Sequence, residues 1–368
     1  MSSNQQLPTL TAADHWIGGR LKCSPADFRV DEIPAYLPCG EGEHLFLFIE
    51  KEDVAAEQLV MHLARALQVP RGDIGVAGMK DRQAITRQWV SVPARHSGNL
   101  TDVTTDKIRL LESALHRNKL KTGHLRGNRF AIVLREPHPD TATRLPQLLA
   151  AVESRGVPNY FGDQRFGREG GTLQLGLDLL AGRKSPGSIP YSRRKFLLRL
   201  ALSSVQSMLF NQVLQTWIER DLLRSVHVGD IMQVCQSGGL FIVEDLDREQ
   251  SRLAEREIVS TGPLFGAKMK TPSGLAGDIE AEVLSQHSLT LGDFDKFPNL
   301  TSGARRPLLV FPENLKGHML PGSDAAHLEF TLPSGCYATV VLREFTGTCE
   351  TLDDNNSAET ADAEAASD

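Results

Sequence analysis

The chain has 368 residues, of which 40% are hydrophobic and 23% are charged, a composition typical of globular proteins. This length allows one large domain or two ordinary ones, each with a sizeable core. No run of about 18 apolar residues is present, so we expect no transmembrane helix. The first residues lack the basic start and apolar stretch of a secretory signal. We therefore expect a cytoplasmic protein that does not bind a membrane.

Charge is unevenly distributed along the chain, whose formal net charge is −6. Residues 350–368 contain 7 of the 46 acidic residues and no Lys or Arg, which leaves 39 acidic residues against 40 basic ones elsewhere. The body of the chain is therefore close to neutral. The segment 350–368 has no apolar periodicity, and we expect an acidic disordered tail that repels phosphate.

Cysteine and histidine patterns indicate no metal site. The five cysteines are scattered, without a CxxC pair, and the eleven histidines are dispersed. Such spacing favours neither a zinc site nor a disulfide framework, and we expect free thiols in a reducing compartment.

The first part of the chain alternates between strand and helix patterns. An apolar run at 45–50 predicts a strand, and apolar residues on one face of 55–67 predict a helix. Residues 73–78 and 88–93 have the pattern of two further strands, and the segment between them is too polar for a core strand. Another strand is predicted at 130–136.

Two more helices are predicted in the middle of the chain. Asp140 can cap a helix over 141–153, and Gly156 would end that helix. A longer helix is predicted over about 195–218, where apolar residues recur at helical spacing.

Strands return near the end of the chain, at 327–332 and 337–345, after stretches rich in Gly, Ser and Pro. The order of elements is therefore strand-rich at both ends, with a mixed middle. This order predicts an α+β protein with an inserted domain.

Common cofactor motifs are missing from the sequence. The stretch GVAGMKDR places Met79 between Gly78 and Lys80 and lacks the hydroxyl residue of a phosphate loop. No GxGxxG, GxSxG or HExxH motif is present. By elimination, the sequence favours chemistry without a cofactor.

The segment 78–88, GMKDRQAITRQ, places a carboxylate on a polar loop between two predicted strands. Loops held by a rigid scaffold often carry catalytic groups. An ordinary turn is the alternative, because Gly and Asp are both turn formers.

Two runs are basic and contain no acidic residue: 117–129, with five Lys or Arg, and 183–199, with six. Cations neutralise phosphates, the amide of Asn128 can bind a base edge, and the ring of Phe130 can stack on a base. A solvated basic hairpin or helix face explains these runs equally well. The aromatic, Gly and Arg residues of 159–167 fit a nucleic-acid surface, although we prefer a packed domain junction there.

Taken together, these stretches closely resemble the tRNA pseudouridine synthase D (TruD) family. The combination of a KDxxAxTxQ loop with an NYFGxQRFG segment is highly specific, since we know of no other family that carries both. The matching segments are Leu21-Lys22 through Asp27-Phe28, Glu43-His44, 78–88, 125–130, 157–167, 207–212, Phe330 to Pro333 and 341–344.

The resemblance implies an α+β fold: a pseudouridine synthase core with a mixed, largely antiparallel sheet and helices, plus an inserted α/β TRUD domain. The catalytic domain would be discontinuous, comprising 1–155 and 305–349. The inserted domain would span 156–304, and the acidic tail 350–368 lies outside the resemblance.

The resemblance also implies a function and a set of site residues. The expected activity is that of an isomerase, a tRNA pseudouridine(13) synthase, with tRNA as partner, no cofactor and no obligate protein partner. Asp81 matches the catalytic nucleophile, and Lys22 matches a basic residue that orients it. The residues expected to bind the target uridine are Phe28, Asn128, Phe130 and Phe330.

Uridine isomerisation breaks the bond from N1 to C1′ and forms a bond from C5 to C1′, without redox change. An anionic nucleophile can attack C1′ or C6, and both routes remain open. The base that removes the C5 proton is not assigned. A non-catalytic RNA-binding protein on the same scaffold, and a pseudouridine synthase for another RNA target, are the alternative functions.

Overall fold

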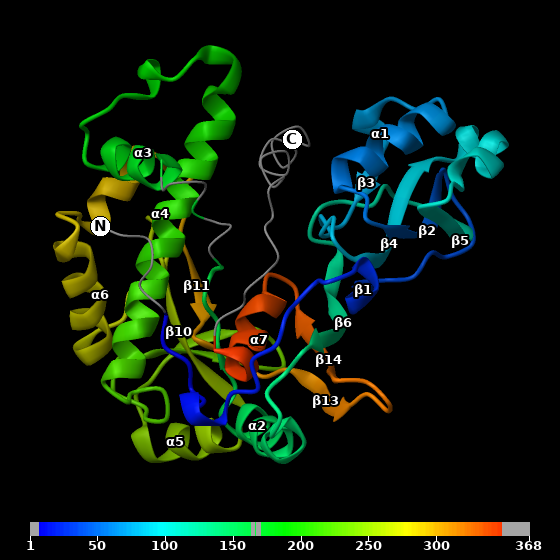
Figure 1. Ribbon diagram of the computed structural model, residues 1–368. Helices are drawn as coiled ribbons and strands as arrows, with labels where there is room; N and C mark the ends of the chain where they lie inside the picture. Colours follow the sequence, from blue (N-terminus) through cyan, green and yellow to red (C-terminus); the bar gives the residue numbers. More distant parts are fainter. Residues whose placement is uncertain (1–6, 163–165, 167–170, 348–368) are drawn as a thin grey trace. The chain divides into compact units, whose positions relative to one another are not determined.

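The computed structural model describes residues 7–162, 166 and 171–347, which form two compact units (Figure 1). The first unit comprises residues 11–155 together with the described residues from Phe311 onward. The second comprises 156–310 and the described residues before Thr11. The predicted acidic tail lies outside the described residues.

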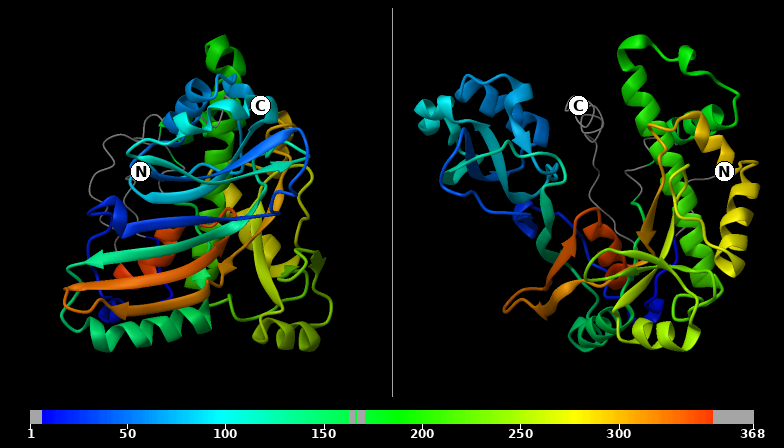
Figure 2. Two further views of the ribbon diagram at one scale, coloured as in Figure 1. Left: turned by 90° about the vertical axis from the view of Figure 1, so that its right-hand side faces the viewer. Right: turned by 180° about the vertical axis from the view of Figure 1, so that it is seen from behind.

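An eight-stranded sheet forms the centre of the first unit. Its strands are β1 (Phe28–Pro34), β2 (His44–Glu52), β3 (Gly75–Val76), β4 (Ile85–Pro93), β5 (Ile108–His116), β6 (Leu125–Arg135), β13 (Glu313–Met319) and β14 (Ala325–Pro333). The strand order is β13-β14-β6-β1-β4-β2-β5, and β3 pairs with β4. Figure 2 shows β13 and β14 (orange) beside β6. Only β1 and β4 pair in parallel, which confirms the expected mixed, largely antiparallel sheet of an α+β fold.

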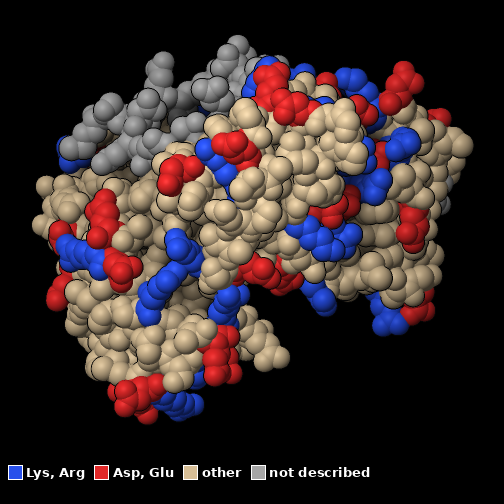
Figure 3. Space-filling model, turned by 60° about the horizontal axis from the view of Figure 1, so that its bottom comes forward, with Lys and Arg blue, Asp and Glu red and all other residues tan. Residues whose placement is uncertain are grey.

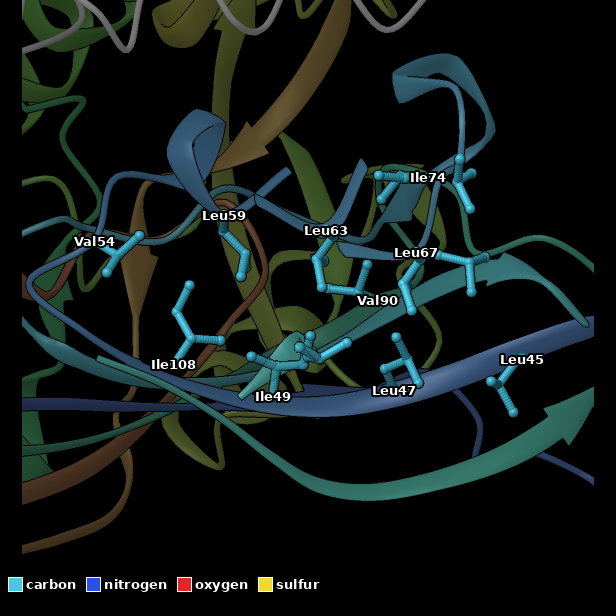
Figure 4. Packing of buried hydrophobic residues seen from close by; sticks show 13 residues of the cluster. Leu45, Leu47, Ile49, Val54, Leu59, Leu63, Leu67, Ile74, Val90 and Ile108 are labelled. Carbon is cyan, nitrogen blue, oxygen red and sulfur yellow. The ribbon is translucent and has the colours of Figure 1, made fainter. Parts of the chain in front are cut away.

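Helices cover this sheet because alternate strand residues are apolar. The helix α1 (Ala56–Ala66) places Leu59 and Leu63 on the inward residues of β2, which include Leu47 and Ile49 (Figure 4). Burial of a leucine or isoleucine side chain contributes about 1.5–3 kcal/mol relative to leaving it exposed. This cluster therefore packs α1 against β2 and β4.

The predicted helix after Asp140 is α2 (Thr141–Arg155), and Leu145, Leu148 and Val152 are buried on it. It ends at Arg155, and the φ of +73° at the following Gly156 suits a residue without a Cβ. The short 3₁₀ segments of this unit are η1 (Ala13–His15), η2 (Pro25–Asp27), η3 (Arg71–Asp73) and η4 (Ala94–Val103).

The predicted strand at 337–345 is wrong, because this segment forms the helix α7 (Ala338–Thr346). Ala338, Val341, Leu342 and Phe345 are buried there. Their spacing of three and four residues is that of one helix face. The β-branched residues among them favour a strand by propensity, but tertiary packing decides the structure.

The second unit contains four α-helices and a four-stranded sheet among its described residues. The helices are α3 (Gly171–Leu180), α4 (Tyr191–Glu219), α5 (Leu246–Ala254) and α6 (Gly274–Gln286), with 3₁₀ segments η7 (Pro186–Ser188) and η8 (Leu291–Lys296). The sheet has the order β11-β10-β8-β9, with β8 (Ile231–Val234), β9 (Leu240–Ile242), β10 (Ile258–Leu264) and β11 (Ala304–Pro307). The long helix predicted at about 195–218 is α4, which begins four residues earlier than expected.

A two-stranded ladder marks where the chain enters and leaves this unit. The strand β7 (Val157–Pro158) pairs antiparallel with β12 (Leu309–Val310). The resemblance implies a return to the first domain at 305, whereas β11 pairs with β10 inside the second unit. The compact unit therefore extends to Val310. Among the described residues, no helix is long and apolar enough to cross a membrane.

Candidate active site

Asp81 lies on the loop between β3 and β4 in the first unit, and its side chain is 47% exposed. The loop ends at Ala84, which is fully buried, and β4 begins at the next residue. Asp81 thus has a firmly held main chain on its C-terminal side and a carboxylate that solvent can reach. This arrangement suits a group that must contact a substrate.

Lys22 connects this carboxylate to the apolar part of the site. Its side chain is only 4% exposed, and its Nζ lies 3.1 Å from Oδ2 of Asp81. The same Nζ lies 4.6 Å from the centre of the Phe28 ring, within the range of a cation–π contact. The structure therefore brings together Asp81 and Lys22, to which the resemblance gives the roles of nucleophile and orienting cation.

The three phenylalanines of the predicted site lie on adjacent strands β1, β6 and β14. Phe130 contacts Phe28 edge-on at 6.2 Å between ring centres, and Phe330 at 5.3 Å. Phe130 and Phe330 are direct cross-strand partners. All three are buried, with exposed fractions of 2% for Phe28, 6% for Phe130 and 1% for Phe330. They form an apolar floor, and their contact with a uridine stays a prediction.

Asn128 lies on the same face of β6 as Phe130, two residues before it. Its cross-strand partner on β1 is Glu32. The side-chain oxygen of Asn128 is buried and has no hydrogen-bond partner among the described residues. An unsatisfied buried oxygen is destabilising, and a donor on a bound ligand could satisfy it. Its predicted contact with uracil remains untested.

A buried ion pair next to the site was not predicted from the sequence. Nζ of Lys80 lies 2.6 Å from Oε2 of Glu32, and both side chains are almost completely buried. Burial raises the pKa of the Glu32 carboxyl. The charge of Lys80 and the hydrogen bonds that this carboxyl accepts act in the opposite direction. The side chain that precedes Asp81 is thereby anchored to β1.

Lys51 was also missed, although the strand pattern contained a signal for it. In β2 the residues at alternate positions Leu45, Leu47 and Ile49 are buried, and Lys51 continues this series. A lysine at an inward position of a strand needs buried polar partners. Lys51 finds them in main-chain carbonyl groups, including that of Asp81.

Neither of the two basic runs forms a simple hairpin beside this site. The run 117–129 links β5 to β6, which are separated in the sheet by β2, β4 and β1, so it crosses the sheet. In the run 183–199, Arg183 and Lys184 form ion pairs with Asp178 of α3. Among the described residues, no group of three or more His, Cys, Asp or Glu is placed to hold a metal ion.

Comparison with known proteins places both units within one family. Residues 6–185 and 192–345 match the family described as tRNA pseudouridine synthase D (TruD). The chain is 40% identical over 340 residues to tRNA pseudouridine synthase D of Anaeromyxobacter dehalogenans, covering 92% of this chain and 96% of that protein. It is 40% identical over 341 residues to tRNA pseudouridine synthase D of Thermus thermophilus, covering 92% of each.

The fold is similar to that of a solved structure as well. A crystal structure assigned to tRNA pseudouridine synthase D of Methanosarcina mazei is 25% identical and superposes with a TM-score of 0.73, covering 91% of this chain and 94% of the other. This similarity identifies the fold as that of a class of RNA-modifying proteins. The chain belongs to the tRNA pseudouridine synthase D (TruD) family.

Proposed function

We propose that this protein is a tRNA pseudouridine synthase that isomerises a uridine of tRNA, at position 13, with Asp81 as nucleophile. The exposed carboxylate of Asp81, held by the buried ammonium of Lys22, is the observation that supports this role most strongly. The first unit would be the catalytic domain and 156–310 the inserted TRUD domain. Because its substrate is tRNA, we propose that the protein works in the cytoplasm.

The reaction needs an anionic group that can form a bond to the nucleoside and leave again. Attack by a carboxylate oxygen of Asp81 on C1′ would break the N1–C1′ bond directly, whereas attack on C6 would form an adduct in which the N1–C1′ bond then breaks and the bound ring rotates; Asp81 leaves again at the end of either route. In either route the uracil then reattaches through C5, and the C5 proton is lost. The charge of Lys22 keeps the carboxylate in one place during these steps.

The target base must leave its stack to reach Asp81, which costs a few kcal/mol. An apolar floor such as that of Phe28, Phe130 and Phe330 can return part of this cost by packing against the base. Aromatic contacts with a base contribute about 1–3 kcal/mol each. The unsatisfied oxygen of Asn128 could accept the N3–H of uracil, which would distinguish uracil from cytosine.

The proposal is tested with tRNA transcripts that carry tritium at uridine C5. The wild-type protein should release label to water, whereas Asp81→Asn should reduce release by at least about 10³-fold, because the nucleophile is lost. Asp106→Asn removes an exposed carboxylate of the same unit and serves as the matched control. Equal release by Asp81→Asn and wild type would exclude Asp81 from the mechanism.

A second transcript tests the position of the target. Replacement of uridine 13 by cytidine should abolish label release while other uridines remain labelled. Undiminished release from this transcript would show that the protein acts elsewhere in tRNA.

A further inference from the structure

Lys51 is fully buried in the first unit, at the end of β2. Its Nζ donates to the carbonyl oxygens of Val54 and Asp81, each at 2.7 Å, and lies 3.4 Å from that of Lys80. A single ammonium therefore ties the end of β2 to two consecutive residues of the loop that carries Asp81.

The charge of Lys51 is not needed to fill this space. Moving an ammonium into a protein interior carries a large desolvation penalty, and a hydrophobic residue of similar volume is often as stable or more stable. The acceptors are three main-chain carbonyls, which compensate the charge only in part. A buried cation at this position is therefore better explained by what it does to the loop than by its contribution to packing.

We propose that Lys51 is a positioning residue for Asp81. Lys22 binds the carboxylate of Asp81, whereas Lys51 binds its main-chain carbonyl. The two lysines thus hold the same residue from two sides, and the side chain of Asp81 stays half exposed. This inference rests on the proposed function, since it gives Asp81 a reaction to perform.

The ion pair of Lys80 with Glu32 supports the same interpretation. The side chain of Lys80 extends to β1, while its carbonyl faces Lys51. The loop is consequently anchored to β1 by the side chain of Lys80 and to β2 by the side chain of Lys51, which donates to loop carbonyls. Displacement of a reacting group by about 1 Å can lower a rate about 10²-fold. We therefore expect a rigid support for Asp81 to have a large effect on the reaction rate.

The environment of Lys51 makes its effect dependent on pH. Burial lowers the pKa of Lys51 to about 8, the charge of Lys80 lowers it as well, and Asp81 and Asp53 raise it. The carboxylate of Asp53, which follows β2, is itself paired with other cations. As the pH rises through about 8, Lys51 loses its charge and its hold on the carbonyl of Asp81 weakens.

The test uses Lys51→Met, which keeps an unbranched side chain one atom shorter than that of lysine and removes the ammonium. Lys107→Met is the matched control, because Lys107 is exposed and pairs with Asp53 in the same region. We expect Lys51→Met to lower the single-turnover rate of pseudouridine formation about 10²-fold without change in tRNA affinity. A wild-type rate in folded Lys51→Met, or a loss that equals its loss of tRNA affinity, would overturn the proposal.

A pH profile gives a second measurement that needs no variant. Between pH 7 and pH 9 the wild-type single-turnover rate should fall as Lys51 is deprotonated, and Lys107→Met should follow the same curve. A wild-type rate that stays constant over this range overturns the proposal even where Lys51→Met does not fold. If the proposed function itself fails, the wild-type protein forms no pseudouridine at any pH, which separates the two failures.

Discussion

At the scale of single residues, the backbone of Lys22 has an unusual conformation. Its φ of +54° lies in the left-handed region, which residues with a side chain rarely adopt. Such conformations cost roughly 1–3 kcal/mol and persist where the surrounding structure enforces them. The result is a buried ammonium that lies over the Phe28 ring and 3.1 Å from Asp81.

Replacement of Lys22 tests whether this ammonium orients the nucleophile. Lys22→Met should lower the single-turnover rate about 10–10²-fold through misplacement of Asp81, with tRNA affinity nearly unchanged. Rates and filter-binding affinities would be measured together. Arg20→Met removes an exposed cation two residues earlier and should behave as wild type; a similar loss in both variants would indicate a general effect of charge.

A second residue-scale prediction concerns Glu280 of α6 in the second unit. Its carboxylate is buried and lies 2.7 Å from Nη1 of Arg305. Burial raises the pKa of Glu280 to about 7, against the effect of Arg305. Between the ordinary carboxyl pKa and about pH 7, the folded state therefore binds more protons than the unfolded state. The contribution of Glu280 to the free energy of unfolding falls as the pH rises through this range.

Glu280→Gln should remove this part of the pH dependence. Relative to the variant, the wild-type protein should lose on the order of 2 kcal/mol of unfolding free energy between about pH 5 and pH 7. Urea unfolding at each pH measures the difference. Glu282→Gln changes an exposed carboxyl of the same helix. It should leave the pH dependence of the unfolding free energy as in the wild type. If both variants gave the wild-type slope, Glu280 would titrate normally.

At the scale of secondary-structure elements, the close approach of β6 and β14 shapes the floor of the site. A Cβ atom at Gly127 would lie 2.1 Å from the carbonyl oxygen of Leu332. Gly127 is next to Asn128, and Leu332 lies two residues after Phe330. The two strands can therefore carry these side chains at their present spacing only with glycine at 127.

Gly127→Ala should push β14 away from β6, because the contact is to main-chain atoms that cannot rotate aside. We expect a loss of about 1–3 kcal/mol in unfolding free energy, measured by urea unfolding, together with a slower reaction. Gly72→Ala is a suitable control, since nothing lies within 4 Å of a Cβ there. A variant as stable as wild type would mean that the strands adjust without strain.

The strands and helices could be predicted where side-chain periodicity and burial agree. The strand at 45–50 and the helix at 55–67 correspond to β2 and α1, whose apolar residues face one cluster. The segment 337–345 could not be predicted in this way, because its β-branched residues favour a strand while its buried positions have helical spacing. The path of 117–129 across the sheet depends on strand order, which no local pattern encodes.

For the candidate site, the sequence alone identified a carboxylate on a loop, and the resemblance supplied its partners. The contact between Lys22 and Asp81 joins residues 59 positions apart, and spacing in the sequence cannot predict such a contact. Lys51 and the Lys80–Glu32 pair were missed because lysine and glutamate are usually exposed. The alternation in β2 marks Lys51 as an inward residue, but Lys80 lies on the loop before Asp81, and its pairing with Glu32 of β1 depends on the fold.

At the scale of the whole molecule, charge separates the body of the chain from its last residues. Lys and Arg are interspersed with Asp and Glu over the face drawn in Figure 3. The body has 40 basic and 39 acidic residues, whereas 350–368 contains seven acidic residues and no basic one. Association with tRNA depends on phosphate neutralisation, so the last residues should oppose it.

Removal of residues 350–368 should therefore strengthen tRNA binding. We expect the dissociation constant to fall several-fold at low salt, and the effect to fade as salt shortens the screening length to about 8 Å. Filter binding at several salt concentrations measures it. A full-length variant with Asn and Gln in place of the seven acidic residues separates charge from bulk, because it should bind as tightly as the shortened chain. Weaker binding by either variant would mean that this segment assists association with tRNA.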